Sequence, residues 1–84
     1  ANMLRAMQAY EQQDYLLAQQ QFQQLLSLGN DTAAFNLAVM AYKGQGEPAD
    51  PVKAAALLGL AAQLSHPEAA ATRQSIASSL TPAQ

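Results

Sequence analysis

The chain has 84 residues, of which 50% are apolar, 6% aromatic and 12% charged, and its formal net charge is −2. This length allows one small domain, and its longest apolar run, residues 54–62, is too short to span a bilayer, which takes roughly 20 residues. The basic residues are scattered singly, so we expect no nucleic-acid partner and no direct membrane insertion. Cysteine is absent, which excludes disulfides and thiolate metal sites.

Helix-forming residues dominate the chain from end to end. Ala, Leu, Gln, Met and Lys favour helices, and Val39, Val52 and Ile76 are the only Val or Ile residues, which argues against strands. Apolar residues recur at spacings of three and four, as amphipathic helices require. The sequence predicts an all-α protein with helices near 3–12, 15–28, 31–43, 51–64 and 67–79.

Polar caps and glycine mark the ends of the second, third and fourth helices. Gly29 ends the second helix, and Asn30 caps the third. Asp50 caps the fourth helix, whose first residue is Pro51, a residue suited to that position.

Proline also marks two later helix starts. We expect the fifth helix to begin at Pro67 after His66, or to be capped by Ser65 with Glu68 three residues on. The pair Thr81-Pro82 has the same form as Asp50-Pro51, so a further helix is expected to begin there.

The predicted helices repeat along the chain. The second and fourth match at an offset of 36 residues, which places Ala18 on Ala54 and Phe22 on Leu58. The first and third match at an offset of 32, which places Tyr10 on Tyr42. The chain therefore divides into unit one (about 2–29), unit two (about 31–65) and a partial third unit (about 66–80), and we expect it to be part of a longer protein.

Unit two resembles the Sel-one-like repeat family, a branch of the tetratricopeptide-like helical repeats. The residues that carry the resemblance are Leu37-Ala38, Gly44-Gln45-Gly46, Pro48, Asp50, Lys53-Ala54, Ala61-Ala62, His66, Glu68 and Ala69. Unit one is similar to the tetratricopeptide-type repeat that often precedes such units. One departure is Ser65, which stands where the family has glycine and must adopt a turn conformation that glycine takes more easily.

The resemblance implies a short right-handed α-solenoid whose first helices line a concave surface and whose second helices form the convex side. It also implies a bacterial scaffold for protein–protein interaction, with no enzyme activity and no cofactor. A periplasmic or secreted location is the expectation that follows, with the cytoplasm as the alternative.

Candidate binding residues lie at matching positions of the three first helices. They are Leu4, Gln8 and Glu11 in the first, Asn36, Met40 and Lys43 in the third, and Thr72, Ile76 and Ser79 in the last. Their mixture of apolar, amide and charged groups suits a peptide or a partner helix. The alternative is that Met40 and Ile76 pack in the core, whereas the amide of Asn36 has little reason to be there.

The residues that suggest chemistry have structural explanations. Gly44-Gln45-Gly46 lacks the strand and the Gly-Lys-Ser/Thr of a phosphate loop, and we expect a turn with positive φ angles. Tyr10 and Tyr42 are expected to brace the loop between helices, and the lone His66 to cap a helix or lie on the surface. The six carboxylates include no pair at useful spacing with a histidine or a second acid, so we expect no catalytic site.

The sequence thus predicts a non-catalytic interaction scaffold that binds a protein or peptide on its first-helix surface. The alternative is a structural spacer or homo-oligomerising segment of a larger bacterial envelope protein, because residues 52–64 are apolar nearly all round. Either way we expect a monomer or a weak homo-oligomer.

Overall fold

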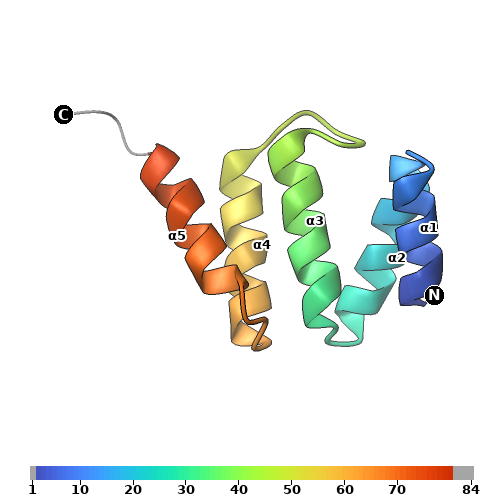
Figure 1. Cartoon of the computed structure of the whole chain (residues 1–84), viewed down its shortest axis with the longest axis horizontal. Coiled ribbons are helices and arrows are strands. Elements are labelled where there is room, and N and C mark those ends of the chain that lie inside the picture. The colour runs from blue at the N-terminus through green and yellow to red at the C-terminus, as the bar shows by residue number, and fades with distance from the viewer. Residues whose placement is uncertain (1, 81–84) are drawn as a thin grey trace.

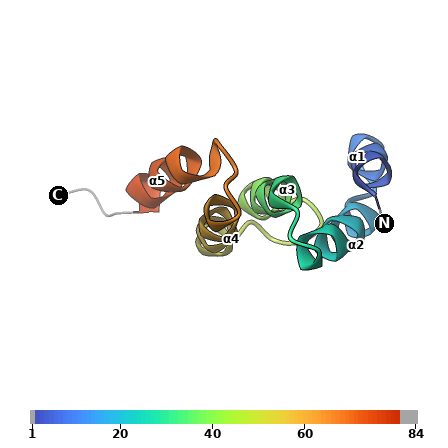
Figure 2. The same ribbon diagram turned by 90° about the horizontal axis from the view of Figure 1, so that it is seen from below.

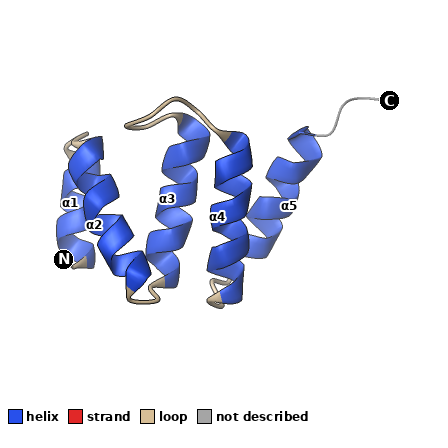
Figure 3. Ribbon diagram, turned by 180° about the vertical axis from the view of Figure 1, so that it is seen from behind, coloured by secondary structure: helices blue, strands red, loops and turns tan. Residues whose placement is uncertain are grey.

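In the computed structural model, which describes residues 2–80 and the side chains of residues 2–78, the described chain forms five helices and no strand (Figure 1). The helices are α1 (Met3–Glu11), α2 (Tyr15–Ser27), α3 (Asp31–Lys43), α4 (Pro51–Gln63) and α5 (Ala69–Leu80). Loops connect them, as Figure 3 shows. The all-α prediction is confirmed. The helix expected to begin at Thr81-Pro82 lies outside the described residues.

The first four helices begin where a polar side chain caps them. The carboxylate of Asp50 accepts a hydrogen bond from the amide of Lys53 at 3.0 Å, and the side chain of Asn30 accepts one from Ala33 at 2.9 Å. Asp14 and Asn2 act in the same way on α2 and α1. These bonds satisfy amides that have no partner within the helix, so the helix starts follow from residue type.

The start of α5 differs from the prediction. The helix begins at Ala69, two residues after Pro67, because Nδ1 of His66 accepts the amide of Glu68 at 3.2 Å and holds residues 67 and 68 in a turn. Ser65 has φ +72°, the left-handed conformation expected for it. The ring of His66 also stacks on Phe35, with centroids 4.3 Å apart.

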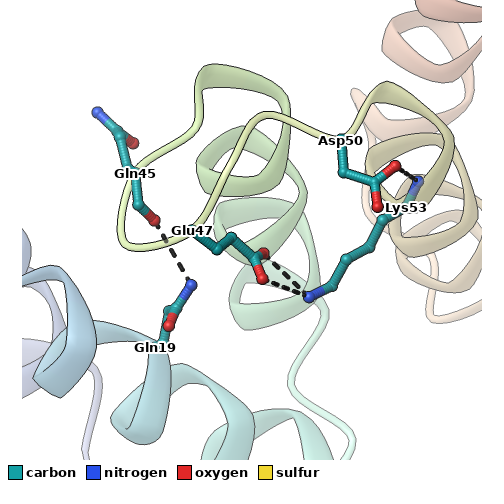
Figure 4. A network of polar contacts seen from close by, with 5 residues as sticks. All are labelled: Gln19, Gln45, Glu47, Asp50 and Lys53. Atoms are coloured by element: carbon teal, nitrogen blue, oxygen red, sulfur yellow. Dashed lines mark hydrogen bonds and ion pairs between the residues drawn. The ribbon is translucent and has the colours of Figure 1, made fainter.

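The loop between α3 and α4 is tied to both units. Gly44 ends α3 with φ +74°, and Gly46 has φ +86° where a β-carbon would lie 3.1 Å from Cβ of Tyr15. These values confirm the expected turn and add a close approach to α2 that requires glycine. An ion pair between Lys53 and Glu47 (2.9 Å) and a hydrogen bond from the amide of Gln19 to the Gln45 carbonyl (3.5 Å) complete the contacts (Figure 4).

The helices lie in a row in which each packs against the next. In Figure 2, where the helices are seen nearly end-on and the row runs horizontally, α1, α3 and α5 lie toward one side of the row and α2 and α4 toward the other. The row bends so that the odd-numbered helices occupy its inner side. Neighbouring odd-numbered helices, α1 with α3 and α3 with α5, therefore lie beside each other on the same side of the row.

Two apolar clusters, which share α3, form the core. One lies among α1, α2 and α3 and comprises Ala6, Ala9, Ala18, Phe22, Leu25, Ala33, Leu37 and Met40. The other lies among α3, α4 and α5 and comprises Ala34, Ala38, Ala41, Ala54, Leu58, Ala61, Ala69 and Ile76. Leu26 and Leu57 pack against both clusters. Alanine dominates because small side chains let helices approach closely.

Candidate functional site

A hollow of about 330 Å³ opens between α3 and α5. Its floor is apolar and consists of buried Ala38, Leu58 and Ile76. The remaining lining residues carry polar or partly exposed side chains: Val39, Tyr42, Lys43, Thr72 and Ser75. We call this the α3/α5 hollow. It offers an apolar seat with hydroxyl groups and one positive charge beside it.

A smaller hollow of about 70 Å³ lies between α1 and α3 and repeats this arrangement. Its lining residues are Met7, Tyr10, Phe22, Asn36 and Val39. At the offsets found in the sequence, Met7 and Tyr10 correspond to Val39 and Tyr42, and Phe22 to Leu58. The linings of the two hollows therefore match at the offsets found in the sequence, and the α1/α3 hollow is the smaller of the two.

Four of the predicted binding residues line these hollows. Lys43, Thr72 and Ile76 line the α3/α5 hollow. Asn36 lines the smaller one, where its amide donates to the sulfur of Met7 at 3.6 Å. Asn36 therefore lies between units one and two and contacts α1. Ser79 lies in α5 but outside the residues whose side chains the structure describes.

The prediction that Met40 lies on the binding surface is wrong. Met40 is only 1% exposed and belongs to the core cluster of α1, α2 and α3, as the alternative predicted. A helix turns by about 100° per residue, which puts Met40 about 40° from Asn36 on the side of Leu37. That side faces α2. Ile76, the matching residue of α5, is 8% exposed and lies at the floor of the α3/α5 hollow, so it is also buried, as the alternative predicted.

The predicted residues of α1 lie on other surfaces. Leu4 and Glu11 are exposed and line neither hollow. Gln8 lines a separate, more polar hollow with Arg5, Ala9, Gln12, Leu17 and Gln21. The reason is that Leu4, Gln8 and Glu11 lie on the side of α1 where an earlier unit would stand, whereas Met7 and Tyr10 face α3.

Sequence reasoning missed Val39, Tyr42 and Ser75 as lining residues. Val39 lines both hollows and corresponds to Met7 at the offset of 32 and to Ser75 at the offset of 36. This correspondence was the signal available in the sequence. Using it requires knowing which side of each first helix faces the next one.

Tyr10 has the role expected of both tyrosines, and Tyr42 does not. The hydroxyl of Tyr10 donates to Oε1 of Gln45 at 2.9 Å, so Tyr10 braces the loop of the next unit as expected. Tyr42 is 44% exposed and lies at the α3/α5 hollow. Among the bonds that the structure describes, none joins Tyr42 to a loop, and its hydroxyl is open to a ligand.

Charged groups are few and lie near the surface. Within residues 2–80, no group of three His, Cys, Asp or Glu side chains could hold a metal ion. None of the described helices is long and apolar enough to cross a membrane. The arrangement around the α3/α5 hollow is suited to binding an apolar group and an anionic or hydrogen-bonding neighbour.

The fold and this hollow define a small all-helical domain with sequential helix packing. In comparisons with protein-family models, curated proteins and solved structures, nothing matches the chain.

Proposed function

We propose that the chain is a non-catalytic interaction module, a short right-handed α-solenoid that binds a peptide or protein segment in the α3/α5 hollow. The observation that carries the proposal is the hollow itself, which lies between two odd-numbered helices and has an apolar floor. The recurrence of its lining in the α1/α3 hollow supports the solenoid, because stacked repeats present equivalent positions along one surface.

The chemistry of the hollow suits one side chain of a peptide together with its neighbour. Its volume, about 330 Å³, is near the lower end for small-molecule sites, roughly 300–1,000 Å³. Leu58 and Ile76 suit one bulky apolar side chain, and Lys43 suits a carboxylate beside it. The expected ligand is a short segment with an apolar anchor next to an acidic residue.

The test is to select peptides from a random display library on the purified protein and to measure their affinities for two charge-matched variants. We expect Lys43→Glu to weaken binding by on the order of tenfold, because it reverses the charge beside the hollow. Arg5→Glu changes the net charge equally at an exposed site on α1 and should leave affinity unchanged. Equal affinities for both variants and the original protein would show that the hollow is not the binding site.

A second candidate is a structural or self-associating segment. Its motivation is α4, where Val52 is 69% and Leu60 37% exposed although both are apolar. If this face is an interface between copies, the protein is an oligomer in solution.

A further inference from the structure

A second groove lies between α4 and α5, on the other side of α5 from the α3/α5 hollow. It measures about 360 Å³. Its lining residues are Ala55 and Ala62 of α4, and Ala70, Arg73, Gln74 and Ala77 of α5. We call it the α4/α5 groove. It shares no lining residue with the hollow of the proposed function.

The same surface occurs one unit earlier, and there it is occupied. Thirty-six residues before the groove residues stand Gln19, Leu26, Ala34, Leu37, Ala38 and Ala41. Helix α4 packs on these positions, because Ala34, Ala38 and Ala41 share a cluster with Ala54, Leu58 and Ala61, and Leu26 packs against it. The groove therefore has the form of a seat for a helix that resembles α4.

We propose that the α4/α5 groove binds an amphipathic helix of a partner protein. The buried residues of α4 give the required pattern, Ala-x3-Leu-x2-Ala, in which small side chains allow close approach and the leucine fills the space between α4 and α5. The helix adds a further layer to the row by the same packing that joins α4 to α3.

The charge of Arg73 specifies one further property of the partner helix. Arg73 replaces the apolar Leu37 of the earlier unit, and its guanidinium lies against Gly59, where a β-carbon would be 3.3 Å from Cζ. The ion pair that the structure records over the described residues joins Lys53 to Glu47 and does not involve Arg73. An Arg fork next to a docked helix is matched by a carboxylate, so the partner helix carries an acidic residue there.

A second copy of the chain does not supply this helix. The stretch with the required pattern, Ala54-Leu58-Ala61, is already buried in the core, and so is Ala18-Phe22-Leu25, which has the same spacing with larger side chains. Two α4/α5 grooves facing each other would also bring Arg73 against the same residue of the other copy.

The α4 sequence itself provides a probe. A synthetic peptide of residues 50–64 is titrated into ¹⁵N-labelled protein and compared with the same peptide carrying Leu57→Glu. Leu57 is the α4 side chain that reaches the cluster containing Leu37, so this change places a carboxylate opposite Arg73. We expect shifts at Ala70, Gln74 and Ala77, and an affinity for the acidic peptide roughly five- to tenfold higher.

Four protein variants complete the test. Arg73→Gln should abolish the advantage of the acidic peptide. Ala70→Phe should fill the groove and prevent binding, whereas Ala71→Phe, at the next exposed position but outside the groove, should not. Lys43→Glu should not matter either, which separates this proposal from the proposed function. The inference is overturned if the peptides cause no shifts at millimolar concentration, or if Ala70→Phe binds them normally. It is also overturned if the signals of the groove residues move with protein concentration alone, because a second copy would then be the occupant.

Discussion

Ser65 joins α4 to α5 in a backbone conformation that is unfavourable for serine. Its φ is +72°, where the β-carbon crowds the following carbonyl, at a cost of about 1–2 kcal/mol. The amides of Ser65 and His66 donate to the carbonyls of Ala62 and Ala61, at 2.9 Å each, so the turn is held by the end of α4. The strain is a local consequence of ending α4 without glycine.

Replacing Ser65 by glycine is expected to stabilise the protein. Relief of the strain exceeds the added flexibility of the unfolded chain, so Ser65→Gly should raise the free energy of unfolding by about 0.5–1 kcal/mol in urea denaturation. Gln63→Gly, two residues earlier in the last turn of α4, should lower it by up to about 1 kcal/mol. If both variants lose stability, the conformation of Ser65 carries no strain.

At the residue scale, caps were predictable and side-chain direction was not. Asn30 and Asp50 cap helices because their short side chains reach amides three residues on, a purely local effect. Met40 is buried and Val39 is partly exposed because of the positions that α2 and α5 take beside α3, which the sequence of α3 does not specify. The start of α5 was predicted at Pro67, two residues too early. The amide of Glu68 donates to Nδ1 of His66, which holds residues 67 and 68 in a turn.

Among the helices, α4 is less buried than its apolar sequence suggests. Residues 52–64 are apolar nearly all round, yet only one face of α4 is buried, through Ala54, Leu58 and Ala61. Ala54 and Ala61 are each 0% exposed. The contact between α3 and α4 therefore depends on side chains small enough to let the two helices approach.

Enlarging a buried alanine of α4 should disrupt this contact. Ala54→Phe is expected to cost about 1–3 kcal/mol of folding stability, because the added ring has no space between α3 and α4. Ala56→Phe, exposed on the same helix, should change stability by less than about 0.5 kcal/mol. Thermal melts followed by circular dichroism compare the two, and equal melting temperatures would contradict the close packing of α4.

The bounds of the first four helices were predictable, since they depend on periodicity and punctuation that the sequence carries locally. The two hollows were not, because each is formed by side chains from three helices. The register of 36 residues, once combined with the order of the row, would have paired Val39 with Ser75. The sequence alone does not give the position of α1 relative to α3, or of α3 relative to α5.

At the scale of the whole molecule, the two ends of the row differ. Helices α3 and α4 pack on α1 and α2 through Leu37, Met40 and Leu57. At the offsets of 32 and 36, these three residues correspond to Arg5, Gln8 and Gln21, so the matching positions at the α1 end are polar, although Leu17 lines the same hollow. The α5 end instead presents the mostly alanine-lined α4/α5 groove.

This asymmetry also opposes growth by stacking of identical copies. Docking α1 and α2 of one copy on α4 and α5 of another would bury Arg5 and the glutamines against mostly apolar side chains, without enough hydrogen-bond partners. The exposed apolar side chains of α4 do not replace that contact. Val52 and Leu60 form one stripe on a helix of 13 residues, whereas stable interfaces bury about 1,600 Å² in total.

We therefore expect sedimentation velocity to show one species of monomer mass from micromolar to millimolar concentration, with a sedimentation coefficient that does not rise. Val52→Lys removes the more exposed of the two apolar side chains on α4 and should sediment identically. A rise with concentration that Val52→Lys abolishes would instead assign α4 to an interface between copies and favour the self-associating alternative. A rise unaffected by Val52→Lys would place the contact elsewhere, with the polar α1 end as the next surface to test by Gln8→Glu.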